Sequence, residues 1–234
     1  MKYLIVFSLL IVSNFASAKT LWSDYSVSLL KGSNYEVGDN DKTVLTFEHT
    51  AATSWGDSFL FVDRLESDNN DRETYGEWSP RIKLTSFKDS FVKSVYIAST
   101  LEMGSFASAT GFGSGFNNYL LGVGVDVNIP GFKFFKINLY HRNNEYGGNS
   151  YQTTLVWGVP LGPLYYDGFL DFATSRDNSE NSMNLTSQLK YNLAPHLDLS
   201  SKLFVGVEYV FWKNKFGIDG VDENNVNLLV KYHF

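Results

Sequence analysis

The sequence predicts an all-β protein, a single antiparallel up-and-down barrel of about twelve strands that spans a membrane. Three observations support this fold class: segments of strand length that alternate apolar and polar residues, turn-rich connections between them, and a closing strand that ends on an aromatic residue. A period of two gives a strand one oily face and one wet face. Soluble β-sandwiches also alternate, but their outer faces are rarely so continuously apolar.

The N-terminal residues predict a secretory signal peptide over residues 1–18. Lys2 supplies a positive start, residues 3–12 form a short apolar run, and residues 16–18 read Ala-Ser-Ala, a small-x-small cleavage site. The run is too short for a comfortable membrane-spanning helix; an uncleaved anchor is the alternative. Residues 19–234 are then expected to form one outer-membrane barrel domain in a Gram-negative cell.

The composition fits an exported barrel and excludes several kinds of site. The chain has no cysteine, so it has no disulfide framework, thiolate metal site or cysteine nucleophile. Aromatic residues make up 16% of the chain, yet the mean hydropathy is only −0.16, because alternating strands cancel in the average. Lys and Arg total 19 against 25 Asp and Glu, which argues against a nucleic-acid-binding surface.

About twelve segments with strand-like alternation follow one another along the chain, an even number as expected of a bacterial barrel. Because backbone groups within hydrocarbon must all be paired, the first segment is expected to pair with the last and close the sheet. The predicted strands lie near residues 22–30, 43–50, 55–65, 75–84, 92–103, 119–129, 133–142, 151–159, 164–172, 183–193, 203–213 and 226–234.

The connections between these segments are expected to alternate between long and short. Outer-membrane barrels have long external loops and short periplasmic turns, and an even strand count puts both termini in the periplasm. Residues 104–118 are expected to be a flexible external or inward-folded loop. The long connections are 31–42, 66–74, 104–118, 143–150, 174–182 and 214–225, and the short ones are 51–54, 85–91, 130–132, 160–163 and 194–202.

The closing strand is predicted over residues 226–234. Its apolar side chains are Val226, Leu228, Val230, Tyr232 and Phe234, with polar or mixed residues between them. The apolar set is expected to face lipid, and the alternate positions to face inward. A final strand that ends on Phe resembles the signal by which the barrel-assembly machinery takes up such proteins. An ordinary antiparallel strand at the chain end is the alternative.

Alternation also predicts which side chains line the interior. In the strand near residues 55–65, Asp57, Phe59, Phe61 and Asp63 share one face, which suits a wet slot better than lipid. Phe rings offer stacking surfaces for a base, and carboxylates accept hydrogen bonds from hydroxyl groups. Paired charges that merely fill the barrel are the alternative for any single residue. The candidate channel-lining residues are Glu48, Asp57, Phe59, Phe61, Asp63, Glu77, Arg81, Tyr96, Asp126, Tyr140 and Arg142.

Three segments carry a resemblance to a known family. Residues 47–50 read Phe-Glu-His-Thr, residues 55–64 read Trp-Gly-Asp-Ser-Phe-Leu-Phe-Val-Asp-Arg, and residues 75–81 read Tyr-Gly-Glu-Trp-Ser-Pro-Arg. Together they resemble the Tsx/OmpK family of nucleoside-specific channel-forming outer-membrane proteins, most strongly over residues 45–84. The resemblance implies a monomeric twelve-stranded barrel that passes nucleosides by diffusion, and some members serve as phage receptors. It assigns to the channel Glu48, Asp57, Phe59, Phe61, Asp63, Glu77 and Arg81.

Enzymatic and metal-dependent functions find little support in the sequence. His141 is followed by Arg142 and Asn143, so the His-x-Ser of an outer-membrane phospholipase is missing, and no Gly-x-Ser-x-Gly occurs. No His pair has zinc spacing, and the acidic turns 38–41 and 68–71 lack the full spacing of calcium ligands.

The sequence therefore predicts a channel without cofactors for small hydrophilic solutes, with nucleosides favoured, surrounded by outer-membrane lipid and lipopolysaccharide. The alternative is a non-transporting surface protein with a plugged lumen, such as a phage receptor or an adhesion barrel.

Overall fold

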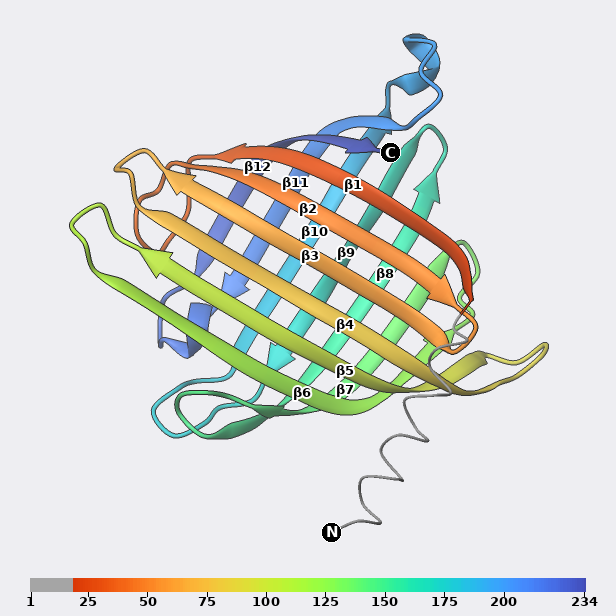
Figure 1. Cartoon of the computed structure of the whole chain (residues 1–234), viewed down its shortest axis with the longest axis horizontal. Coiled ribbons are helices and arrows are strands. Elements are labelled where there is room, and N and C mark those ends of the chain that lie inside the picture. Colours follow the sequence, from red (N-terminus) through yellow and green to blue (C-terminus); the bar gives the residue numbers. More distant parts are fainter. Residues whose placement is uncertain (1–18) are drawn as a thin grey trace, which may run out of the picture.

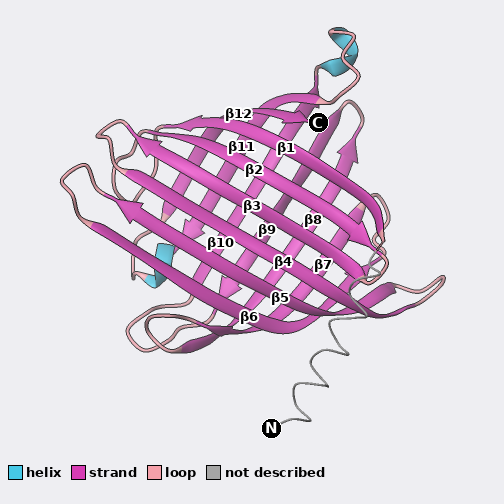
Figure 2. Ribbon diagram, in the orientation of Figure 1, coloured by secondary structure: helices cyan, strands magenta, loops and turns pink. Residues whose placement is uncertain are grey.

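The structure, a computed structural model, describes residues 19–234; the predicted signal peptide lies outside the described residues. The chain forms a closed barrel in which each strand pairs antiparallel with its neighbours in sequence and β1 pairs with β12 (Figures 1 and 2). Its strands are β1 (Thr20–Gly32), β2 (Lys42–Thr53), β3 (Gly56–Ser67), β4 (Arg72–Ser86), β5 (Val92–Ala107), β6 (Gly113–Val127), β7 (Phe134–Asn143), β8 (Asn149–Leu161), β9 (Leu164–Ala173), β10 (Ser182–Asn192), β11 (Leu203–Lys213) and β12 (Glu223–His233).

The predicted fold class is confirmed: a closed, all-β, twelve-stranded antiparallel barrel. The seam between the first and last strands runs from the pair Ser26 and His233 to the pair Lys31 and Leu228. Closure pairs the backbones of the two end strands over these residues, as strands in hydrocarbon require. Within residues 19–234, no helix is long and apolar enough to cross a membrane.

The predicted alternation of long and short connections is only partly right. At one end, here called the loop end, the connections are 33–41, 68–71, 108–112, 144–148, 174–181 and 214–222. At the other, the turn end, they are 54–55, 87–91, 128–133, 162–163 and 193–202, so the longest connection of all lies where a short one was predicted. Gly162, with φ +62°, and Pro163 form the tightest class of turn, in which Gly at the first central position removes the steric cost.

Residues 104–118 are mostly strand, contrary to the prediction. β5 and β6 continue as a paired ladder through Gly104 opposite Phe116 and Ala107 opposite Gly113, so only residues 108–112 form the connection. The Gly, Ser and Asn residues that suggested a loop lie on this ladder, where cross-strand backbone bonding outweighs their low strand propensity.

The two faces of the barrel wall differ as the closing strand predicts. Leu228 is 69% exposed on the outer wall, whereas its neighbours Asn227 and Leu229 are 1% and 2% exposed in the interior. The same contrast separates Leu121 from Leu120 on β6. The buried apolar clusters therefore lie inside the barrel, beside buried polar side chains, and the outer wall is left apolar for lipid.

The connections at the loop end are tied into a continuous ring. Asp39 accepts a hydrogen bond from the Asn69 backbone N–H (2.8 Å), and Asp71 accepts one from that of Ala109 (2.9 Å), which holds the pKa of Asp71 below its usual value. The ring is completed by bonds from Asn117 N–H to Glu145, from the Arg176 side chain to the Tyr146 carbonyl, from Glu180 N–H to the Gly217 carbonyl and from Glu36 N–H to Glu223. These contacts link neighbouring connections around the mouth of the barrel.

Candidate functional site

The inward side chains differ in exposure around the barrel. Most of those of β12 and of β5 to β7 are buried against one another, while those of β2 to β4 and β9 to β11, with β3 and β9 among them, mostly stay partly exposed. β3 and β9 face each other because they lie half the strand order apart in the closed barrel. We call the space between these two walls the slot. Its walls are Asp57, Phe59, Phe61 and Asp63 of β3 and Tyr165, Asp167, Phe169 and Asp171 of β9.

Aromatic rings form a ladder along one side of the slot. The ring centroids of Phe59 and Phe61 are 5.9 Å apart, those of Phe61 and Tyr75 are 5.7 Å apart, and those of Tyr75 and Phe116 are 6.4 Å apart. The ladder runs from β3 across β4 to β6. Spacings of 4.5–7 Å are those of interacting aromatic pairs, so the four rings form a row of neighbouring faces, tilted by 34–54°, that a flat solute can contact in turn.

Near the turn end, a network of buried ions fills the interior beside the ladder. The Arg81 guanidinium contacts Asp57 at 2.5 Å and Asp126 at 2.9 Å, and Lys136 lies 3.4 Å from Asp57. Arg81 also lies 4.1 Å from the centroid of the Tyr96 ring, whose hydroxyl donates to Asp126. Each carboxylate is thus compensated, and the network holds Asp57 at one end of the row that carries Phe59 and Phe61.

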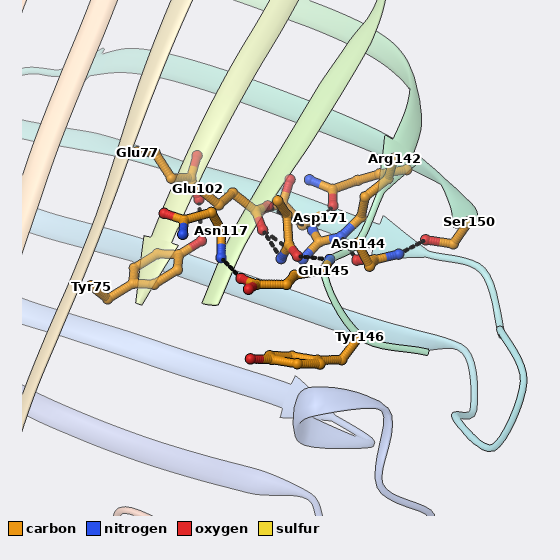
Figure 3. Close-up of polar contacts among 12 residues, drawn as sticks. Tyr75, Glu77, Glu102, Asn117, Arg142, Asn144, Glu145, Tyr146, Ser150 and Asp171 are labelled. Carbon is orange, nitrogen blue, oxygen red and sulfur yellow. Dashed lines mark hydrogen bonds and ion pairs between the residues drawn. The ribbon is translucent and has the colours of Figure 1, made fainter. Parts of the chain in front are cut away.

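Nearer the loop end, three carboxylates gather around one guanidinium. Arg142 makes a two-pronged ion pair with Glu102 (2.6 Å for both contacts), and Glu77 and Asp171 lie beside it (Figure 3). The Tyr75 hydroxyl donates to Glu77 at 2.6 Å and Thr154 donates to Asp171 at 2.5 Å. With more carboxylates than cations, this part of the interior favours hydroxyl donors and disfavours anions.

The remaining inner wall carries further paired groups. Glu48 of β2 forms an ion pair with Lys231 of β12 and accepts a hydrogen bond from Ser26. Lys190 bonds Asp167 at 2.7 Å, and Asp63 accepts from Thr46 at 2.6 Å. These contacts bridge strands that are neighbours or nearly so, and therefore brace the wall.

All eleven candidate residues lie at inward positions, but the structure divides them among different environments. Phe59, Phe61 and Asp63 lie on the slot wall, whereas Arg81 is only 3% exposed and Tyr140 only 5%. Asp57, Arg81, Tyr96 and Asp126 form the turn-end network, and Glu77 and Arg142 belong to the carboxylate group nearer the loop end. Glu48 is tied to Lys231. Ion pairing that fills the barrel therefore accounts for several of them.

Connection 33–41 folds inward at Tyr35, a residue that the sequence pattern did not single out. Tyr35 is 6% exposed, packs on Leu30, Val44 and Leu229 inside the barrel, and donates a hydrogen bond to Asn227 at 3.0 Å. Burial raises the pKa of its hydroxyl, which keeps it a neutral donor. Its ring fills the β1 and β12 side of the interior near the loop end.

Other interior residues were also missed. Phe116 and Tyr75 extend the ladder, and Phe169 lies on the wall opposite to it. The period-two pattern of residues 165–171 was the signal that could have drawn attention to Phe169, since it places that ring between two aspartates. Within residues 19–234, His, Asp and Glu side chains form no group of three or more suited to a metal ion.

Replacing Tyr35 with alanine should raise single-channel conductance, because the ring and its ordered loop occupy part of the interior. The measurement is planar-bilayer recording of purified wild-type and Y35A protein in the same salt. Tyr146→Ala is the matched control, since that ring is 64% exposed at the mouth and should leave conductance unchanged. Equal conductance of wild type and Y35A, with both proteins folded, would show that Tyr35 lies outside the conducting path.

Comparisons with known proteins fit this architecture. The family described as "Nucleoside-specific channel-forming protein, Tsx" matches residues 20–234. Among solved structures, the chain is similar to the KdgM porin, with 12% identity, a TM-score of 0.53, and coverage of 91% of this chain and 99% of that one. It is likewise similar to the KdgM porin in complex with disordered oligogalacturonate (14% identity, TM-score 0.51, the same coverage). These identities show the fold alone. A comparison with curated proteins finds no match.

Proposed function

Because the chain belongs to the family of nucleoside-specific channel-forming proteins, Tsx, we propose that nucleosides cross its barrel by passive diffusion along the slot. Family and fold make it an outer-membrane channel for small solutes. The observation that supports nucleosides as the solute is the aromatic ladder. Its rings Phe59 and Phe61 lie between Asp57 and Asp63 on a partly exposed wall. A nucleoside pairs a flat base with a hydroxylated sugar, and this wall offers a partner for each.

In the proposed mechanism, the base stacks on successive rings while the ribose hydroxyls donate to carboxylates. Stacking of a base on an aromatic side chain is worth about 1–3 kcal/mol, which is enough to concentrate the solute and weak enough to release it. Phe59, Phe61 and Tyr75 would supply the rings, and Asp63 and Glu77 the acceptors. The buried Arg81 and Arg142 act as positioning residues, since each holds carboxylates in place by ion pairs.

The charge of the interior supports a neutral solute. Arg142 forms its ion pair with Glu102, and Glu77 and Asp171 lie beside that pair, so a phosphate group passing them would meet more carboxyl groups than cations. A nucleoside lacks that group. No step of this passage makes or breaks a covalent bond, and we infer that the protein transports without catalysis.

We further infer that the loop end faces the outside of the cell. The strand order supports this, because β1 begins and β12 ends at the turn end, and an even strand count puts both ends of an outer-membrane barrel in the periplasm. We propose that the protein acts as a monomer, that its aromatic closing strand is taken up by the barrel-assembly machinery, and that the exposed loop-end residues serve phages as a receptor surface.

Ion current through the purified protein in a planar bilayer tests the proposed function. Adenosine and thymidine are expected to reduce the current reversibly and saturably in the millimolar range, whereas adenosine monophosphate should block far less. A protein that conducts without response to nucleosides would be a general porin. A folded protein without conductance would favour the plugged surface protein.

A further inference from the structure

The outer wall of the barrel is almost free of charge except in one place. Apart from Lys93 and Lys213, the charged residues at outward positions of the twelve strands are Lys31, Arg64, Glu66 and Arg72. All four lie on β1, β3 and β4 at the loop end. Charge on a lipid-facing wall destabilises a barrel unless it meets water or a polar headgroup, so a cluster of this kind marks a contact with something polar.

The strand register places these residues side by side. Lys31 is opposite Thr43, Thr43 is opposite Glu66, and Glu66 is opposite Arg72, so they form one row across four strands. Neighbouring strands lie about 4.8 Å apart, so the row spans roughly 14 Å between the backbones of Lys31 and Arg72. Two separate cations at this spacing suit a ligand that carries more than one anionic group.

Arg64 lies one row deeper, among apolar residues. It shares its row with Leu29 and Leu45, and its guanidinium donates to Thr74 at 2.9 Å and approaches Glu66 at 3.9 Å. Lys31 bonds Asp68 of the neighbouring connection at 3.0 Å. Within residues 19–234, the Arg72 guanidinium makes no ion pair. The three cations thus outnumber the two acids, and one of them is free for an external anion.

An apolar hollow adjoins this row on the same outer wall. It has a volume of about 490 Å³ and runs over the seam of β1 and β12, lined by Leu29, Lys31, Val205, Leu228 and Val230 among others. Lys31 therefore belongs both to the charged row and to the edge of the hollow. A ligand with an anionic head and a hydrocarbon tail would place its head on the charged row and its tail in the hollow.

We propose that the row of Lys31, Arg64 and Arg72 together with the adjoining hollow is a binding site for the lipid A part of lipopolysaccharide. Lipid A carries phosphates at the two ends of a disaccharide and several acyl chains. The arginines suit phosphate because their planar guanidinium donates two parallel hydrogen bonds. The assignment to the outer leaflet rests on the orientation proposed above, since lipopolysaccharide covers the external face.

Native mass spectrometry of the full-length mature protein in detergent, titrated with lipid A, tests this site. The variant K31Q/R64Q/R72Q is expected to bind lipid A at least about tenfold more weakly than wild type, because it removes the charge-assisted hydrogen bonds to phosphate. The matched control K93Q/K213Q removes two outward lysines elsewhere on the wall and should bind like wild type. Leu228→Trp, which fills the hollow, should weaken binding while it leaves the charged row intact.

Two further lipids identify the partner. Monophosphoryl lipid A should bind more weakly than lipid A, and phosphatidylglycerol more weakly still. Equal binding of phosphatidylglycerol and lipid A would overturn the assignment in favour of any anionic lipid. Equal binding of lipid A by wild type and by K31Q/R64Q/R72Q would show that these three residues form no lipid A site. Nucleoside flux should be unchanged in all these variants, because the residues face outward, so failure of the channel proposal would show separately as an absence of flux in wild type.

Discussion

Nucleoside flux at low solute concentration should fall by about tenfold when Phe59 and Phe61 are both replaced with alanine, since each stacked base gains about 1–3 kcal/mol from an aromatic ring. The two rings form the start of the aromatic ladder on the accessible wall of β3. Their removal also leaves Tyr75 without its neighbour at 5.7 Å. Flux should then rise linearly with nucleoside concentration, because saturation requires a binding site.

Liposome uptake of labelled thymidine, measured across a range of concentrations, gives both the flux at low concentration and the degree of saturation. The matched control is Phe47→Ala with Phe172→Ala, two rings that are 38% and 40% exposed on the outer wall. That pair should leave flux and saturation as in wild type, although it removes the same number of aromatic rings. If the control lowers flux as much as F59A/F61A does, the loss reflects barrel stability, and the ladder is no nucleoside path.

The fold was predictable because a membrane barrel obeys few rules, each visible in the sequence. The alternation at residues 226–234 gave the inner and outer faces of β12, and the requirement for paired backbone in hydrocarbon gave its pairing with β1. Loop lengths were less predictable. The composition of residues 104–118 indicates a loop, yet the ladder of β5 and β6 extends through Gly104 and Gly115. Whether a glycine-rich segment pairs depends on the strand opposite.

The site was predictable only where it follows the period of a strand. Phe59 and Phe61 stand on the inner face because alternate residues share a face, and this holds without knowledge of any contact. Tyr35 lies in a connection with no period, and its partner Asn227 is 192 residues away in sequence. Likewise, alternation places Arg81 inward but does not reveal that two carboxylates cover it. Such contacts depend on tertiary packing.

Replacing Arg81 with methionine should lower the free energy of unfolding by about 3–5 kcal/mol, the usual cost of breaking a buried ion pair from one side. Asp57 and Asp126 would be left without the guanidinium that both contact, at 2.5 and 2.9 Å. The side chain of Arg81 is 4% exposed and those of the two aspartates are 20% and 17% exposed, so water can replace little of the lost interaction.

Equilibrium unfolding in lipopolysaccharide-free detergent, followed by gel mobility, measures this loss. R81M/D126N should recover part of it, since Asp126 is then neutral and Asp57 keeps Lys136 as its partner at 3.4 Å. The exposed outward Arg72 provides the control: R72M should change stability by only about 0.5 kcal/mol. An R81M protein that unfolds like wild type yet passes nucleosides more slowly would contradict the positioning role and assign Arg81 to direct contact with the solute.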